Sequence, residues 1–306
     1  MAAARQPPTG TEKSLTDPEE ADTSRAQLML ADHAYAKHTE EDFMSSLSGK
    51  SILVTGASQG LGRQLALSFA AEGASNIAVL ARRHELLVDL KNELESKYPG
   101  CSVLTIDADL NDEQQIERAV ATIFDVFGGK LDVLVNNASI LGPTPMPYLV
   151  DYPLENFQQV LSTNLLAPFL LIKKLLPAML QQGGSIINVS SDAGVNGHPG
   201  WGAYGISKSG IEGLSKTWAS ELAGSGVRVN VVDPGDMNTA MHGLAEPDGD
   251  PNEWAHPADV VEVFVYLASD ESKAINGRRF EAQDFDRNSI TVISDLRPEL
   301  DTAYVH

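Results

Sequence analysis

The stretch Ser51-Ile-Leu-Val-Thr-Gly-Ala-Ser-Gln-Gly-Leu-Gly62 carries the clearest pattern of local structure in this chain. It opens as a short apolar run of the strand type, and its glycines lead directly into a helical pattern over Arg63 to Glu72. Because glycine has no Cβ, such a loop can turn tightly and bring its backbone close to a diphosphate. Free N–H groups and the positive end of the helix dipole would face that anion. The stretch therefore predicts a nucleotide-binding unit of strand, loop and helix.

Segments of strand type and helix type alternate from Lys50 to Phe280. This alternation is typical of βαβ units, whose parallel strands are joined by right-handed crossovers. We therefore expect an α/β fold in a single domain, with a Rossmann-type doubly wound parallel sheet of about seven strands in the order 3-2-1-4-5-6-7. The expected strands are Ser51 to Thr55, Asn76 to Leu80, Ser102 to Ile106, Leu131 to Val135, Ile186 to Val189, Val227 to Val232 and Ala274 to Phe280.

The two ends of the chain differ in character from this middle part. Residues 1–48 are polar and acidic, with only a weak helical pattern. We expect three parts: this N-terminal extension, partly disordered or helical, the Rossmann domain over residues 49–282, and a C-terminal tail over residues 283–306. A solvated extension is the simpler interpretation of residues 1–48, and a regulatory role is the alternative.

Composition and charge limit the possible partners. The 306 residues carry a formal net charge of -20, which argues against binding to nucleic acid or to an anionic membrane. No apolar stretch approaches the length of a membrane span, and the start of the chain lacks a signal-peptide pattern. The lone Cys101 cannot form an internal disulfide and suggests a reducing compartment. We therefore expect a cytoplasmic protein.

The end of the second expected strand indicates which nucleotide binds. NAD sites usually place a carboxylate there to hold the ribose hydroxyls, whereas an arginine accommodates a 2′-phosphate. Here the uncharged Ala81 is followed by Arg82 and Arg83. We therefore expect NADP(H) to be preferred, with NAD(H) possible. In the alternative interpretation the two arginines form a solvated turn.

The segment from the fifth expected strand to the following helix carries acid/base chemistry. Ser191 stands just after the strand Ile186 to Val189, and the helix begins near Tyr204. Tyr204 and Lys208 are four residues apart and project from one face of that helix. A free tyrosine titrates near ~10, and a neighbouring ammonium would lower its pKa. Ser191 would hydrogen-bond a substrate oxygen while Tyr204 gives or takes its proton. A Tyr-x-x-x-Lys pair alone also occurs by chance on many helices.

Two asparagines are candidates for supporting roles. Asn137, in Asn136-Asn-Ala-Ser139, could tie strand ends together or line the nucleotide cleft. Asn164 lies in an otherwise apolar helix expected from about Leu154 to Gln181, and a buried amide requires a partner. Asn164 could hold a water near Lys208, or it could satisfy a backbone group.

These motifs, in this order and spacing, resemble the short-chain dehydrogenase/reductase family and in particular its compact members. The resemblance covers about Leu47 to Phe280. It rests on Thr55-Gly-Ala-Ser-Gln-Gly-Leu-Gly62, Asn136-Asn-Ala138, Asn164, Ser191, Tyr204-x-x-x-Lys208, and Pro234-Gly235 with Thr239.

The resemblance implies roles for particular residues. Asn164, Ser191, Tyr204 and Lys208 would form the catalytic tetrad, with Tyr204 as the acid/base and Lys208 bound to the nicotinamide ribose. No metal is expected. The cofactor-binding residues that it implies are Gly56, Ser58, Gln59, Gly60, Leu61, Gly62, Arg82, Arg83, Asp109, Leu110, Asn137, Ala138, Tyr204, Lys208, Pro234, Gly235 and Thr239.

The chain departs from the family pattern in three places. Ser139 stands where glycine is commoner, and Asp233 and Asp236 surround the Pro-Gly turn with unusual negative charge. The run Phe280-Glu-Ala-Gln-Asp284 replaces the Asp-Gly-Gly sequence with which many members end. This replacement argues against the subunit contact that the C-terminal strand usually makes, and hence against the tetramer common in the family. We expect a homo-oligomer, either a dimer or a tetramer.

The predicted function is that of an NADP(H)-dependent oxidoreductase, which reversibly transfers a hydride between nicotinamide and a small-molecule ketone or secondary alcohol. The alternatives are an NAD-linked alcohol dehydrogenase and a cofactor-binding regulator or scaffold without turnover. The substrate pocket is expected between the loops Ile140 to Tyr148, Ala193 to Trp201 and Met237 to His256. We interpret the last of these loops as a flexible lid.

Overall fold

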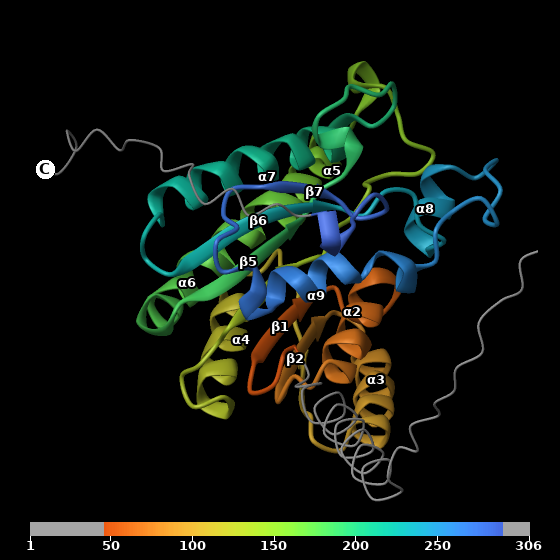
Figure 1. Ribbon diagram of the computed structural model, residues 1–306. Coiled ribbons are helices and arrows are strands. Elements are labelled where there is room, and N and C mark those ends of the chain that lie inside the picture. Colours follow the sequence, from red (N-terminus) through yellow and green to blue (C-terminus); the bar gives the residue numbers. More distant parts are fainter. Residues whose placement is uncertain (1–45, 290–306) are drawn as a thin grey trace, which may run out of the picture. The chain divides into compact units, whose positions relative to one another are not determined.

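The computed structural model describes residues 46–289 of the chain. Most of the expected N-terminal extension, and the chain beyond residue 289, lie outside the described residues. Figure 1 shows a central sheet with helices on both of its faces. The strands are β1 (Ser51–Thr55), β2 (Asn76–Ala81), β3 (Ser102–Asp107), β4 (Val133–Asn136), β5 (Gly184–Val189), β6 (Val227–Asp233) and β7 (Arg279–Glu281).

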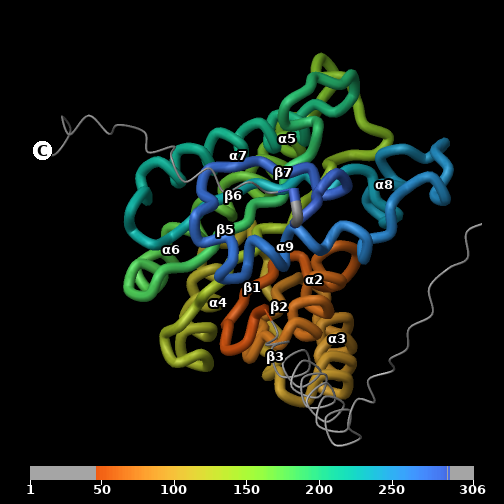
Figure 2. The backbone as a smooth tube through the Cα atoms, viewed as in Figure 1, coloured from red at the N-terminus to blue at the C-terminus, as the bar shows by residue number. Residues whose placement is uncertain are grey.

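The 7-stranded sheet has the order β3-β2-β1-β4-β5-β6-β7, and every neighbouring pair of strands is parallel. The predicted Rossmann-type doubly wound sheet is therefore confirmed, and so is its strand order. Figure 2 follows the backbone outward from β1, first to β3 on one side and later to β7 on the other. Strands β2 and β3 are added on one side of β1, and β4 to β7 are added on the other side. The order of the strands therefore reverses between β1 and β4, and sheets of this kind bind ligands in the crevice at the carboxyl ends of those two strands.

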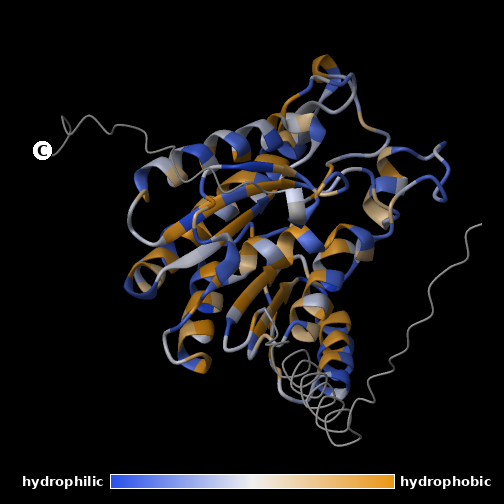
Figure 3. Cartoon of the chain, viewed as in Figure 1, coloured by the Kyte–Doolittle hydropathy of each residue, from blue (hydrophilic) through white to orange (hydrophobic). Residues whose placement is uncertain are grey.

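Two hydrophobic cores lie on the two faces of the sheet. Along β1, Ile52 and Val54 belong to one core and Leu53 to the other, because successive side chains of a strand point to opposite faces. Both faces of β1 are therefore apolar, as the mostly hydrophobic colouring of the central strands in Figure 3 shows. The first core is covered by α2 (Gly60–Ala71), α3 (His84–Lys97) and α9 (Glu262–Ala268), and the second by α4 (Glu113–Val126), α6 (Ala167–Gln182) and α7 (Gly202–Glu221).

A single long helix leads into β5. It consists of α5 (Leu154–Leu161), a π-helical segment (Ser162–Leu166) and α6. At 29 residues, Leu154–Gln182 is long and apolar enough to cross a membrane by length and composition. The expectation that no stretch approaches such a span is therefore wrong for this segment. The α6 face that carries Leu171 and Leu175 is fully buried in the second core. Core helices of globular proteins can be as long and as apolar as membrane-spanning helices.

The boundaries of the last elements differ from the expected ones. The loop after β6, interpreted from sequence as a flexible lid, contains a short helix, α8 (Ala240–Ala245). Strand β7 is shorter than the expected strand from Ala274 to Phe280. The first residues of the expected tail pack on the domain, where the ring of Phe285 lies 5.6 Å from that of Tyr266. Hydrophobic contacts between segments distant in sequence, which local patterns do not reveal, account for both the helix and the packed tail.

Candidate active site

A cavity of about 1310 Å³ opens at the carboxyl ends of the strands. It is lined by the loops that follow the strands from β1 to β7, as the switch point of the sheet requires. Among the predicted site residues, only Gly62 and Asn164 do not line it. Those that do are Gly56, Ser58, Gln59, Gly60, Leu61, Arg82, Arg83, Asp109, Leu110, Asn137, Ala138, Ser191, Tyr204, Lys208, Pro234, Gly235 and Thr239.

The loop between β1 and α2 needs its glycines. Gly56 and Gly60 have φ values of 68° and 53°, in the left-handed region. A Cβ on Gly56 would come within 2.8 Å of the Ala138 Cα, and one on Gly62 within 2.5 Å of the Gly56 carbonyl oxygen. Gln59, the N-cap of α2, forms no side-chain cap hydrogen bond. The first N–H groups of α2 are therefore available to a diphosphate.

Asn137 joins the ends of β1 and β4 beneath this loop. Its Nδ2 donates to the Thr55 carbonyl oxygen at 2.9 Å, and its backbone N–H donates to the Thr55 hydroxyl at 3.0 Å. Asn137 also lines the cavity, so it fulfils both of the roles that its sequence position left open. Asn137 thus holds together the ends of β1 and β4, next to which a dinucleotide would bind.

Positive charge gathers at the end of β2. Arg82 and Arg83 line the cavity directly after Ala81, and the Arg83 guanidinium donates to the Ser58 hydroxyl of the glycine loop at 3.2 Å. Opposite, at the end of β3, Asp109 is held in place by its own turn, where its carboxylate accepts from the Asn111 backbone N–H at 3.0 Å. This arrangement suits a ribose that carries a 2′-phosphate, because guanidinium groups bind phosphates strongly.

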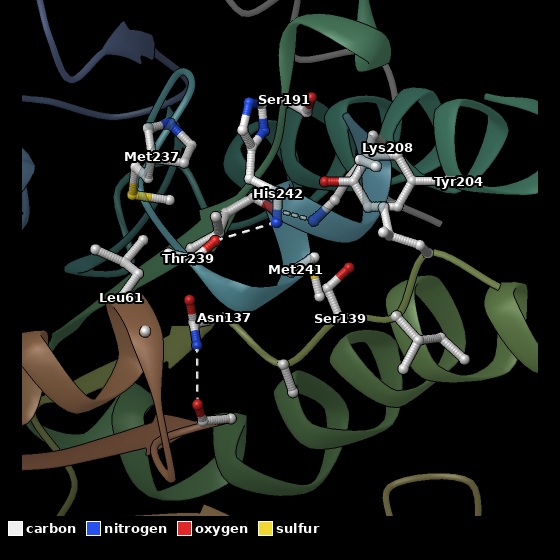
Figure 4. Close-up of a pocket in the computed structure, with 18 of the residues that line it drawn as sticks. Leu61, Asn137, Ser139, Ser191, Tyr204, Lys208, Met237, Thr239, Met241 and His242 are labelled. Carbon is white, nitrogen blue, oxygen red and sulfur yellow. Dashed lines mark hydrogen bonds between the residues drawn. The ribbon is translucent and has the colours of Figure 1, made fainter. Parts of the chain in front are cut away.

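Tyr204 and Lys208 lie on the buried face of α7 and have exposed fractions of only 8% and 3%. The Lys208 Nζ donates to the Val189 carbonyl oxygen at 2.8 Å and lies 5.4 Å from the centre of the Tyr204 ring. Ser191 follows β5, and its hydroxyl accepts from the Ala193 N–H at 3.2 Å. Figure 4 shows Ser191, Tyr204 and Lys208 together in the wall of the cavity. The structure therefore brings these three predicted residues to one place.

Burial controls the ionisation of this pair. Burial raises the pKa of Tyr204 far above its usual value, and the carboxylates of Asp233 and Asp192 add to the rise, while a hydrogen bond with Ser191 opposes it. Burial also lowers the pKa of Lys208 to about 8, against the opposing effect of Asp233 and Glu212. The expected lowering of the Tyr204 pKa is thus reversed, because a buried phenolate is poorly solvated and would lie near two carboxylates. At neutral pH the site holds a neutral phenol, which can act as an acid.

Asn164 is buried beneath the site instead of lining it. Its amide accepts from the Ile140 N–H at 2.9 Å, donates to the Ile140 carbonyl oxygen at 3.0 Å, and donates to the Ser207 hydroxyl at 3.0 Å. Of the two roles considered for it, the structure therefore shows the satisfaction of a backbone group. It lies in the π-helical segment, and such segments are frequent at functional sites.

Sequence reasoning missed an ionic cluster behind Lys208. Arg279 of β7 binds the Glu212 Oε1 through Nε at 3.0 Å and the Asp233 Oδ2 through Nη2 at 2.7 Å. Both carboxylates are almost completely buried. Glu212 stands four residues after Lys208, so helical spacing alone could have placed it on the same face of α7. Its pairing with Arg279 depends on the sheet and has no local signal.

The ligands that this cavity could hold are limited in kind. Within residues 46–289 no group of His, Cys, Asp and Glu side chains is arranged to hold a metal ion. A glycine loop for a diphosphate, two arginines for a 2′-phosphate and a buried Tyr/Lys pair line one cavity. Together with the doubly wound sheet, they define the class of dinucleotide-dependent oxidoreductases.

Comparison with known proteins identifies the family within that class. The family model for short chain dehydrogenase matches residues 50–249, and the chain belongs to the short-chain dehydrogenase/reductase family. The 3-oxoacyl-(acyl-carrier-protein) reductase FabG of Thermotoga maritima is 39% identical over 241 residues, which are 76% of this chain and 95% of that protein. The suggested family is thereby confirmed, and the chain is an NAD(P)-dependent enzyme of that family.

Solved structures agree with this assignment. A protein from Pseudomonas syringae, named as a short chain dehydrogenase, has a TM-score of 0.75 and 38% identity over 78% of this chain and 97% of its own. Another from Escherichia coli CFT073, named likewise and complexed with NADPH, has a TM-score of 0.73 and 32% identity over 78% of this chain and 99% of its own.

Proposed function

We propose that the protein reversibly transfers a hydride between NADP(H) and a ketone or secondary alcohol, with Tyr204 as the acid/base. The observation that carries this proposal is the position of Tyr204. Its buried phenol lines the same cavity as the glycine loop and the two arginines, beside Ser191 and Lys208. A proton donor and a dinucleotide site therefore share one cleft, which is the arrangement that hydride transfer to a carbonyl requires.

Each residue has a defined task in this reaction. Bound NADPH would supply the hydride to the carbonyl carbon. The Ser191 hydroxyl donates a hydrogen bond to the carbonyl oxygen, and Tyr204 gives its proton to that oxygen as the alcohol forms. Lys208, held by the Val189 carbonyl oxygen, binds the ribose and places a positive charge beside the phenolate that remains. Asn164 acts as a positioning residue, since it fixes α7 through Ser207.

NADP(H) is the preferred cofactor in this proposal. Arg82 and Arg83 follow β2 where an NAD site would place a carboxylate, and a relative of known structure is complexed with NADPH. We expect NADPH to bind at least tenfold more tightly than NADH in calorimetric titration. We further expect the double variant Arg82→Ala/Arg83→Ala to lose most of that difference while its affinity for NADH changes little. Equal binding of both nucleotides by the wild type would favour the NAD-linked alternative.

The direct test of the activity is coupled turnover. Purified protein would be assayed with NADPH and NADH against ketones, quinones, keto-esters and sugars, with Tyr204→Phe as the control. Tyr204-dependent oxidation of NADPH by any of these compounds supports the proposal. Nucleotide binding without Tyr204-dependent turnover across the panel would instead favour a regulator or scaffold.

We also propose a homo-oligomer in the cytoplasm. Leu166, in the π-helical segment, and Ile206, on α7, are 52% and 43% exposed, and exposed apolar residues on neighbouring helices suit a contact between subunits. The lone, buried thiol of Cys101 fits a reducing compartment. Light scattering after size-exclusion chromatography would report the oligomer, and a monomer at micromolar concentration would contradict it.

A further inference from the structure

The cavity has two halves of different charge. Among the described residues that line it, Arg82, Arg83 and Lys208 are the only lysines and arginines. Both arginines lie at the cofactor end, where Arg83 contacts the glycine loop, and the Lys208 Nζ is bonded to a backbone carbonyl oxygen. The half beyond Ser191 and Tyr204, formed by α8 and the loop after β5, therefore has no lysine or arginine within residues 46–289.

Carboxylates line this substrate half instead. Asp192 directly follows Ser191, and Asp236 and Glu246 flank α8. A substrate with a carboxylate or phosphate group would meet these charges without a compensating cation. Because the three side chains are 49–70% exposed, part of their repulsion is screened by solvent and salt.

His242 supplies an unsatisfied polar atom in the same half. Its side chain is only 12% exposed, and its Nε2 is buried and has no hydrogen-bond partner among the described residues, so a substrate hydroxyl reaches this nitrogen only when the His242 side chain turns toward the cavity. The Nε2 lies 3.8 Å from the Asp236 Oδ1 and 4.0 Å from the Glu246 Oε2, and the ring packs edge-on against Trp254 with centroids 4.4 Å apart. A hydroxyl group suits this place, because it can bond an imidazole nitrogen and donate to a carboxylate at once.

The wall beside the reacting carbonyl has similar chemistry. Asp192 binds the His198 Nε2 at 2.7 Å and accepts from the Ser191 hydroxyl at 3.1 Å. The ring of Trp201 lies 5.6 Å from that of Tyr204 and provides an apolar surface next to these polar groups. Hydrogen-bonding groups and an aromatic face thus surround the site, and both can contact a chain of hydroxyl-bearing carbons.

We propose that the substrate is an uncharged, hydroxyl-bearing carbonyl compound of the ketose and polyol class, with His242 bound to one of its hydroxyls. The proposal rests on the hydride-transfer function given above and adds the substrate class. In the oxidative direction Tyr204 first releases its phenolic proton to solvent. The carbinol carbon would then give its hydride to NADP⁺ and the hydroxyl proton would pass to the phenolate oxygen, so that the products are a ketone, NADPH and a proton. Compounds with a carboxylate or phosphate are poor substrates because the half that receives them is acidic.

Matched six-carbon alcohols test the substrate class. D-Glucitol, D-mannitol and galactitol would be compared with the corresponding aldonates, with D-glucitol 6-phosphate and with 2-hexanol, each with NADP⁺ at low salt. We expect kcat/KM for the best hexitol to exceed that of every anionic analogue, and that of 2-hexanol, at least tenfold. An aldonate, a phosphate or 2-hexanol as the best substrate would overturn the proposal.

Variants test the assigned residues. His242→Phe keeps a ring against Trp254 and should raise KM for the hexitol at least tenfold with unchanged NADPH affinity. His84→Phe, at an exposed histidine of α3, is the matched control and should change neither. Asp236→Asn/Glu246→Gln should raise kcat/KM for aldonates at least fivefold at low salt, and less at high salt. If the hexitol KM of His242→Phe equals that of the wild type, or the double variant shows no gain, the assignment falls.

The outcomes separate this inference from the function on which it rests. Tyr204-dependent turnover of other ketones, without turnover of any hexitol, would leave the oxidoreductase function intact and overturn the substrate class. Absence of Tyr204-dependent turnover with every compound, despite NADPH binding, would overturn both proposals together.

Discussion

Among the single residues of the site, burial has its largest effects on the ionisation of Lys208 and Tyr204. Burial lowers the pKa of Lys208 from 10.5 to about 8. Between these values the folded protein has lost the lysine proton while the unfolded chain still holds it. Because the unfolded state then binds more protons, the Lys208 contribution to stability rises with pH through this window. The Tyr204 pKa is raised above its usual value of 10.0, so its effect on stability begins only above that pH.

Lys208→Met removes this titration. We expect the free energy of unfolding of the wild type, relative to the variant, to increase by about 1–2 kcal/mol from pH 7 to pH 9.5. Urea denaturation at the two pH values measures the change. Lys216→Met, at an exposed position on the same helix, should show no such dependence. A constant or falling difference between wild type and Lys208→Met would contradict a buried lysine with a lowered pKa.

Arg279 compensates two buried carboxylates at once. Arg279→Met would leave Glu212 and Asp233 without the partner that they bind at 3.0 and 2.7 Å. We expect a loss of about 3–5 kcal/mol in the free energy of unfolding, since an unpaired buried charge is costly. Arg278→Met, at the exposed neighbouring arginine, is the control and should cost less than about 0.5 kcal/mol. Similar effects of both variants in urea denaturation would show that the cluster contributes little.

The predictability of single residues followed the range of their contacts. Ser191, Tyr204 and Lys208 could be placed together from sequence, because a strand end and a helical spacing are local features. The role of Arg279 could not, since it binds residues of α7 and β6 through the pairing of β6 with β7. The direction of the Tyr204 pKa shift was also missed, because burial is a property of the packed domain.

The close packing of the loop between β1 and α2 limits which residues can replace its glycines. A Cβ on Gly62 would come within 2.5 Å of both the Asn137 Nδ2 and the Gly56 carbonyl oxygen. We expect Gly62→Ala to lower stability by roughly 1–3 kcal/mol and to weaken NADPH binding, because the loop must shift. Thermal denaturation and calorimetry measure the two effects.

Gly213 provides the matched control for that substitution. It lies on α7, where an added Cβ would meet no atom within 4 Å. Gly213→Ala should therefore leave NADPH binding unchanged and raise stability by up to ~1 kcal/mol, through the better helix propensity of alanine. If Gly62→Ala behaved like Gly213→Ala, the close packing of the loop would not constrain the site.

Elements with a strong local pattern were predicted well. The buried strands β1, β2, β4, β5 and β6 have apolar runs, which is typical of parallel sheets covered on both faces. Helix α8 was missed because it is only six residues long and the loop around it, Met237 to His256, is polar and contains two prolines. Its Met241 and Ala245 pack beside Leu141, Tyr204 and Trp201, which are distant in sequence. Packing with distant residues therefore decides this element.

In the domain as a whole, the order of the strands brings the glycine loop, the arginines and the Tyr204 site to one cavity. Residues from Gly56 to Asp284 line one cavity because every parallel strand ends at the same edge of the sheet. The alternating pattern sufficed to predict that edge as the binding site. The charge within the cavity could not be predicted from the net charge of -20, since both arginines that line it lie at the cofactor end and Asp192, Asp236 and Glu246 lie in the substrate half.

The kinetics of the Tyr204→Phe variant test whether Tyr204 is the acid/base of the reaction. The substitution removes one hydroxyl from a buried ring and leaves the glycine loop and the arginines in place. We expect the variant to bind NADPH with the affinity of the wild type and to lose turnover of the best carbonyl substrate by at least about two orders of magnitude. Turnover close to that of the wild type, with intact NADPH binding, would contradict Tyr204 as the acid/base and with it the proposed mechanism.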